Sequence, residues 1–246
     1  RKGIGTIMSY LLAAIVCVFS VFMGIMYPVS LQPTTWMIIL SIYVLISAGL
    51  PVWLILQPRD FINVQILYGG IILLLLSIFS IGFGGATLTM PSFNIAQGAS
   101  SLGFIWPMMF ITIACGAISG FHSLVAGGTT SKQLGNECDA RRIGYNGMLL
   151  ESVLAVCVLI AIGASLSFED YRSIVWPTAA GVKSNPILGF SLAAGHLFHN
   201  GLGINVALGT IFGILLVEGF VVTTLDSAVR LNRYLFEELW NIIFRN

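Results

Sequence analysis

The side chains that could carry out chemistry in this sequence are few, ionisable and set among apolar residues. Glu218 lies inside the run 214–220, His122 lies among small residues, and Asp226 directly follows the stretch 221–225. An isolated charge in an apolar environment costs several kcal/mol, so each group must be neutral, paired or facing a polar cavity. These residues are therefore candidates for carrying a proton, with Glu218 the best of them.

The segment 116–132 surrounds His122 with glycines and hydroxyl groups. The spacing of Gly116 and Gly120 indicates close helix packing, which is the simpler interpretation of the glycines and serines. An ionisable residue at membrane depth instead predicts a functional role, so His122 favours a segment that lines a transport path. The segment also carries the hydroxyl groups of Ser119, Ser123, Thr129 and Thr130.

A second interruption is predicted at Ser47, Gly49 and Pro51, with Trp53 close behind. Pro51 removes the N–H that would bond to the Ser47 carbonyl, and its ring clashes with that carbonyl. A simple proline kink would account for this pattern. Transporters also use such breaks to offer free backbone groups to substrates and ions, which would make this break functional.

The other ionisable residues suit structural roles at least as well as functional ones. Glu151, near the start of an apolar run, fits a helix N-terminal acid as well as a proton-coupling group. Asp226 and Arg230 have the i,i+4 spacing of a helix-surface ion pair. His196 and His199 lack further ligands nearby, so no metal site is expected. The sequence has no catalytic triad, Walker loop, dinucleotide fingerprint or HExxH, and we expect neither an enzyme nor a cofactor.

These residues must be positioned by membrane-spanning helices. Of 246 residues, 57% are hydrophobic and 9% charged, against roughly 25% charged in soluble domains. About 20 apolar residues cross a bilayer, and the predicted spans are 5–27, 36–56, 64–84, 104–120, 147–168 and 203–225. The run 187–199 is too short and predicts a half-helix, a re-entrant segment or an interfacial segment. An amphipathic stretch, 226–240, is expected on the cytoplasmic surface.

The distribution of positive charge agrees with these six spans. Nine of the eleven Lys and Arg residues fall on the side of Arg1 and Lys2, and only Arg172 and Lys183 fall on the other side. This bias predicts a cytoplasmic first loop. A net charge of +1 argues against a nucleic-acid partner. The four cysteines have no close spacing that would indicate a disulfide framework or a zinc site, and the chain is expected to be an interior piece of a longer protein.

Several strings of residues, in order along the chain, are similar to the carbon-starvation protein A family. The strings are 50–60 (LPVWLILQPRD), 87–91 (TLTMP), 111–122 (ITIACGAISGFH) continuing to Thr130, and 143–152 (IGYNGMLLES). His199, Glu218, Asp226 and Arg230 also fall where the family has them. The resemblance implies a multi-pass inner-membrane transporter that takes up peptides, or pyruvate with protons, when carbon is scarce.

The resemblance further implies an all-α bundle that is part of an inverted-repeat, LeuT-like transporter fold. Earlier helices of the same protein would then complete the substrate site. In that fold the span 36–56 would be a discontinuous helix, and the resemblance assigns substrate contact to Ser47, Gly49, Pro51 and Trp53. The span 104–120 would complete the cation site, and the resemblance assigns the ion or proton to Ser119, His122, Ser123, Thr129 and Thr130. Two other functions stay open: a membrane-embedded sensor or scaffold subunit, and a membrane enzyme whose catalytic group lies outside this chain.

Overall fold

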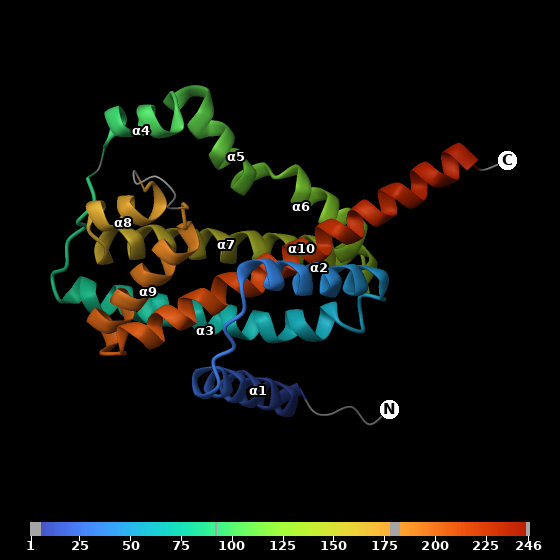
Figure 1. Ribbon diagram of the computed structural model, residues 1–246, viewed down its shortest axis with the longest axis horizontal. Coiled ribbons are helices and arrows are strands. Elements are labelled where there is room, and N and C mark those ends of the chain that lie inside the picture. Colours follow the sequence, from blue (N-terminus) through green and yellow to red (C-terminus); the bar gives the residue numbers. More distant parts are fainter. Residues whose placement is uncertain (1–5, 92, 178–182, 245–246) are drawn as a thin grey trace. The chain divides into compact units, whose positions relative to one another are not determined.

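A computed structural model describes residues 6–91, 93–177 and 183–244, and these residues form helices and connecting loops with no strand (Figure 1). Gly5 of the first predicted span, and Arg1, Lys2 and Arg245 of the charge bias, lie outside the described residues. The α-helices are α1 (Thr6–Met26), α2 (Pro33–Gly49), α3 (Leu56–Phe83), α4 (Ile95–Leu102), α5 (Phe110–Ile118), α6 (Gly120–Val125), α7 (Cys138–Ser165), α8 (Phe168–Val175), α9 (Pro186–Leu202) and α10 (Val206–Phe244). Short π and 3-10 turns, η1 (Ile105–Met109), η2 (Ala126–Thr130) and η3 (Ser131–Gln133), flank α5 and α6.

Five helical stretches among the described residues are long and apolar enough to cross a membrane, where the sequence predicted six. They are Ile7–Met26, Leu56–Phe83, Ile105–Gln133, Cys138–Ser165 and Val206–Phe244. The predicted span 36–56 corresponds to α2, which is apolar but only 17 residues long because it ends at Gly49. The all-helical, multi-pass character expected from composition is confirmed.

The chain divides into two compact units, each described here by itself. The terminal unit comprises Arg1–Gly69 and Glu218–Asn246, and the central unit comprises Gly70–Val217. Long helices therefore contribute to both units: α3 and α10 each have one part in the terminal unit and the other in the central unit.

The core of the central unit is built around α9, whose buried face is rich in small residues. A Cβ added to Gly201 would lie 2.8 Å from the Cα and the carbonyl oxygen of Ser77 in α3, and one added to Gly195 would lie 2.8 Å from the Val206 carbonyl oxygen in α10. Glycine at these positions lets the backbones approach closely. The segment 187–199, predicted as a half-helix, a re-entrant segment or an interfacial segment, thus lies within a 17-residue helix that is packed into the core.

The connection between α9 and α10 is a tight turn. Gly203 adopts a φ of 70°, a left-handed conformation that glycine reaches without steric cost. Asn205 then accepts a hydrogen bond from the Ala207 N–H at 2.9 Å through its side chain, which caps the start of α10. From Val206, α10 continues for 39 residues to Phe244, so the stretch 226–240 is the continuation of the same helix as 203–225.

The predicted interruption in the segment 116–130 is present at Ser119. This residue has an extended conformation, with φ −61° and ψ 122°, between the end of α5 at Ile118 and the start of α6 at Gly120. The interruption at Gly49–Pro51 takes a different form. There α2 ends, Leu50 is extended, and the chain turns into α3 at Leu56. The expected discontinuous helix is therefore a helix end followed by a turn.

Candidate functional site

A cluster of charged side chains lies inside the terminal unit, where α3 and α10 meet. Arg59 comes from the first turn of α3 and Asp226 from the middle of α10, and a guanidinium N–H of Arg59 donates to Asp226 Oδ2. Arg59 also donates to Tyr43 Oη at 2.8 Å and to Thr223 Oγ1 at 3.2 Å. Its guanidinium lies 3.8 Å from the second carboxylate, Asp60. One arginine thus contacts two carboxylates and two hydroxyl groups.

Asp226 is fully buried, and only part of its hydrogen-bonding capacity is used. Its exposed fraction is 0%, and its Oδ1 atom has no hydrogen-bond partner among the described residues. Asp60, by contrast, is half-buried and accepts a hydrogen bond from Thr223 at 3.0 Å. Asn63 completes the same face by donating to the Gly219 carbonyl at 3.1 Å. The free oxygen of a buried carboxylate is a position where a proton can bind.

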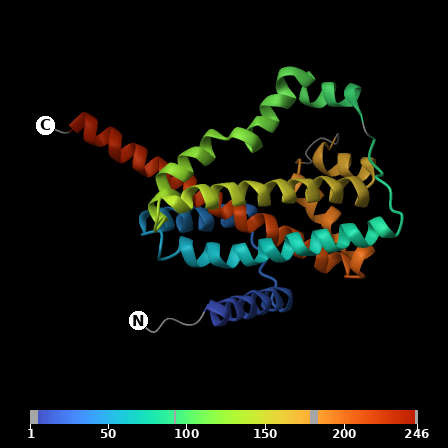
Figure 2. The same ribbon diagram turned by 180° about the vertical axis from the view of Figure 1, so that it is seen from behind.

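Two arginines of α10 hold the carbonyl end of α2. The helices α2 and α10 lie side by side in both views (Figures 1 and 2). Arg230 donates to the Ser47 and Leu50 carbonyls, each at 2.8 Å. Arg233 donates to the carbonyls of Ala48, at 2.8 Å, and Gly49, at 3.3 Å. The last carbonyls of a helix have no partners within the helix, and here the arginines satisfy them and complement the negative end of the helix dipole.

The spacing of Asp226 and Arg230 suggested a helix-surface ion pair, and that interpretation is wrong. Both side chains are buried, with exposed fractions of 0% and 1% for the two residues. Each has a partner on another helix: Asp226 bonds to Arg59 of α3, and Arg230 bonds to α2. Within the terminal unit, Asp226 therefore connects α10 to α3, and Arg230 connects α10 to α2.

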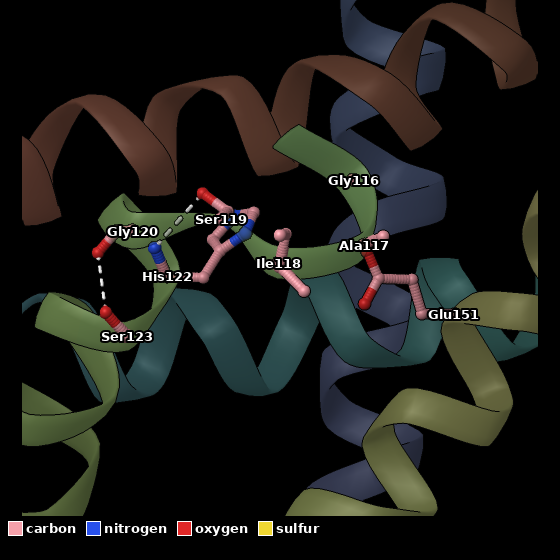
Figure 3. A pocket seen from close by; sticks show the side chains of 8 residues that line it. All are labelled: Gly116, Ala117, Ile118, Ser119, Gly120, His122, Ser123 and Glu151. Atoms are coloured by element: carbon pink, nitrogen blue, oxygen red, sulfur yellow. Dashed lines mark hydrogen bonds between the residues drawn. The ribbon is translucent and has the colours of Figure 1, made fainter. Parts of the chain in front are cut away.

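A pocket of about 480 Å³ lies beside the Ser119 break in the central unit (Figure 3). It is lined by Gly116, Ala117, Ile118, Ser119, Gly120, His122, Ser123 and Glu151. The Ser119 side chain accepts a hydrogen bond from the His122 backbone N–H at 3.4 Å, and Ser123 Oγ donates to the Gly120 carbonyl at 2.7 Å. Figure 3 shows the Glu151 carboxylate reaching from α7 toward Ala117.

The structure thus brings some of the predicted site residues together and leaves others apart. Ser119, His122 and Ser123 share this pocket, whereas Thr129 and Thr130 do not line it; Thr129 is buried with an unpartnered hydroxyl group. Ser47 and Gly49 meet the arginines of α10 through their carbonyls. Pro51 and Trp53 follow in the turn with exposed side chains.

The structure also shows the surroundings of Glu218 and His199. Glu218 is exposed and forms no hydrogen bond or ion pair within the described part of the chain. His199 Nδ1 lies 3.0 Å from the Ile204 carbonyl oxygen at the end of α9. Among the described residues no group of three or more His, Cys, Asp or Glu side chains could hold a metal ion.

Sequence reasoning missed Arg59, Asp60 and Asn63 as site residues. The three follow Pro58 closely, at the start of a helix that is otherwise strongly apolar. Ionisable residues within membrane helices usually pair with one another, so Asp226 and Arg59 could have been matched by that rule. Only the packing of α3 on α10 shows that Asp226 pairs with Arg59 and not with Arg230.

The chain matches the family Carbon starvation protein CstA over residues 1–182 and 164–246. It is 33% identical, over 256 aligned residues, to the peptide transporter CstA of Escherichia coli strain K12, covering 85% of this chain and 36% of that protein. It is 30% identical over 243 aligned residues to the peptide transporter CstA of Bacillus subtilis strain 168, covering 88% of this chain and 40% of that protein.

Part of the chain is similar to a transporter with a different named substrate. Identity to the pyruvate/proton symporter BtsT of Escherichia coli strain K12 is 46% over 119 aligned residues, which cover 48% of this chain and 17% of that protein. This chain therefore spans about two fifths or less of the length of these curated relatives. No solved structure matches it.

Proposed function

Because this chain belongs to the Carbon starvation protein CstA family, we propose that it forms part of the membrane core of a proton-coupled importer of peptides or pyruvate. The chain is a multi-pass protein of the cell inner membrane, and its relatives are named as transporters, not enzymes. Uptake by the full-length protein would serve the cell when carbon is scarce. Its assignment to a LeuT-like inverted-repeat fold remains part of this proposal.

The observation that carries the proposal is the buried, half-satisfied carboxylate of Asp226. Arg59 holds one oxygen of this carboxylate, and the other oxygen has no partner among the described residues. A proton on Oδ1 would neutralise the carboxylate and weaken its attraction for Arg59. Since Arg59 also lies beside Asp60, the guanidinium can shift its pairing between the two carboxylates. Proton binding is thereby linked to the contact between α3 and α10.

The charged and titratable groups around Asp226 fit this role. Arg59 and Asp60 face Asp226 from α3, and Tyr43 of α2 accepts a hydrogen bond from Arg59. Arg230 lies one turn beyond Asp226 on α10. We therefore place the coupling proton on Asp226 in preference to Glu218, which is exposed and unpaired within the described chain. An inward proton is driven by the membrane potential with about 2.3 kcal/mol per charge per 100 mV.

The substrate carboxylate shared by peptides and pyruvate remains assigned to the turn that carries Ser47, Gly49, Pro51 and Trp53. A helix N-terminus, with its free N–H groups, would attract a carboxylate, but Gly49 lies at the carbonyl end of α2. Positive charge at this turn comes instead from Arg230 and Arg233 of α10. Arg230 is buried against the helix end, so the partly exposed guanidinium of Arg233, and not free backbone N–H groups, would draw a carboxylate there.

The test is uptake of labelled pyruvate and a labelled dipeptide by the full-length protein in proteoliposomes, with and without an imposed proton gradient. Asp226→Asn, which mimics the neutral carboxyl, should reduce gradient-driven accumulation at least tenfold while substrate exchange without a gradient continues. Asp139→Asn, at an exposed carboxylate on α7, is the matched control and should behave as wild type. Glu218→Gln is measured beside them.

Unchanged accumulation in Asp226→Asn, or loss of accumulation in Glu218→Gln alone, would remove Asp226 from the coupling step. Absence of any uptake by the wild-type protein would instead favour a sensor or scaffold role.

A further inference from the structure

Two features place negative charge at the pocket beside the Ser119 break. Glu151 lines it, is exposed, and has no hydrogen bond or ion pair within the described residues. The residues Gly116–Ile118, which form the last turn of α5, also line it. Carbonyls of a last helical turn lack partners within the helix, and the helix dipole places partial negative charge there. The N-terminus of α6 lines the same pocket, and the Ser119 hydroxyl accepts a hydrogen bond from its His122 N–H. The Glu151 carboxylate is therefore the feature of the lining that favours a cation.

The composition of the pocket favours an organic ammonium group over a metal ion. The lining contains one carboxylate and one imidazole, and no group of three metal-ligating side chains exists among the described residues. A volume of about 480 Å³ is within the range of small-molecule sites and far larger than a bare ion needs. The lining also contains no Lys or Arg that would compete for Glu151.

An ammonium group has three N–H donors, and this pocket offers acceptors of three kinds. These are the Glu151 carboxylate on α7, the carbonyls at the end of α5, and the imidazole and hydroxyl groups of His122 and Ser119 next to the break (Figure 3). The extended backbone of Ser119 is what exposes the end of α5 to the pocket. A helix that continued through residue 119 would have consumed those carbonyls in its own hydrogen bonds.

We propose that this pocket, as a recognition site of its own, binds the free α-ammonium group of a peptide substrate, with Glu151 as its counter-ion. The inference rests on the proposed function and specifies its substrate, because pyruvate has a carboxylate but no ammonium group. A transporter with this pocket should prefer peptides with a free amino terminus. Glu151 would set that preference without taking part in the proton step at Asp226.

The experiment uses the purified full-length protein and measures both binding and proteoliposome uptake of a labelled dipeptide. The N-acetylated form of that dipeptide, which has no ammonium group, and pyruvate are measured in parallel. Glu151→Gln keeps the size of the side chain and removes its charge. Glu238→Gln, at an exposed glutamate of α10 that is unpaired within the described residues, is the matched control.

We expect Glu151→Gln to raise the apparent Kd and KM for the free dipeptide at least tenfold. Binding of the N-acetyl dipeptide and of pyruvate should change less than twofold. Wild-type protein should bind the N-acetyl dipeptide at least tenfold more weakly than the free dipeptide, and Glu238→Gln should match wild type throughout.

Three results would overturn the inference. The first is an equal effect of Glu151→Gln on the free and the acetylated dipeptide, and the second is no effect on either. The third is a loss of dipeptide binding in Glu151→Gln that appears only when sodium replaces potassium in the buffer. That result would identify a coupling-cation site instead. If the wild-type protein binds the dipeptide in a Glu151-dependent way but transports nothing, the ammonium site stands and the proposed transport function fails.

Discussion

Replacing Arg230 by leucine should destabilise the terminal unit, because this arginine holds the carbonyl end of α2. The variant loses two hydrogen bonds of 2.8 Å, to the Ser47 and Leu50 carbonyls, in a region where Arg230 is 1% exposed. Hydrogen bonds to a charged group contribute about 1.5–3 kcal/mol each, so the gross loss is about 3–6 kcal/mol. Relief of the cost of burying a guanidinium offsets part of this loss, and we expect a net decrease of about 3 kcal/mol in unfolding free energy.

A lysine at the same position should restore only part of the loss. Its ammonium keeps the charge near the helix end, but it lacks the planar fork that reaches two carbonyls at once. Arg230→Lys should therefore be destabilised by about half as much as Arg230→Leu, roughly 1.5 kcal/mol. Arg141→Leu removes an exposed arginine that has no partner among the described residues and should change stability by no more than about 0.5 kcal/mol.

The measurement is equilibrium unfolding of the full-length protein in mixed micelles, followed by tryptophan fluorescence. Trp53 lies in the turn that follows α2, so its fluorescence reports on the helix end that the arginine holds. If Arg230→Leu and Arg141→Leu lose the same free energy within about 0.5 kcal/mol, the arginine bonds do not hold α2.

Two further sets of variants, one for each unit, test the packing in the same unfolding assay. Arg59→Met leaves the buried Asp226 carboxylate without its partner and should cost about 3–5 kcal/mol, whereas the double variant with Asp226→Leu should recover most of that loss; a double variant no more stable than Arg59→Met would contradict the pairing. In the central unit, Gly201→Ala would place a methyl group 2.8 Å from the Ser77 backbone and should cost about 1–3 kcal/mol. Gly147→Ala on α7 meets open space and should stabilise by up to about 1 kcal/mol; similar effects of the two alanines would show that α9 does not require close approach at Gly201.

Much of the architecture followed from composition and periodicity alone. Long apolar runs can satisfy their backbone polar groups in lipid only as helices, which is why four predicted spans overlap the long helices α1, α3, α7 and α10. The bounds differ, because α3 and α7 begin before the predicted spans and α10 continues beyond residue 225. An interruption in the segment around Ser119 was also predicted, because glycines and serines weaken a helix and the neighbouring His122 indicated a functional role. The proline at position 51 correctly indicated that a regular helix could not continue through it.

The partners of the ionisable residues were decided by the tertiary structure. From the sequence, Asp226 and Arg230 are four residues apart and Glu218 is the deepest acid, so local spacing favoured a surface ion pair and a buried Glu218. The packing of α10 against α2 and α3 instead turns Asp226 and Arg230 into the terminal unit and leaves Glu218 exposed. Sequence spacing gives the face of a helix on which a residue lies, but only the neighbouring helices determine what that face meets.

The sequence by itself therefore determined that this chain is a membrane protein, that it is helical, and where its helices are interrupted. These properties depend on hydrophobicity and backbone hydrogen bonding, which are local to each segment. The tertiary structure decided which carboxylate is buried with a free oxygen, which arginines close the end of α2, and that Glu151 faces the break at Ser119. Those contacts join residues up to 185 positions apart, and no local pattern encodes them.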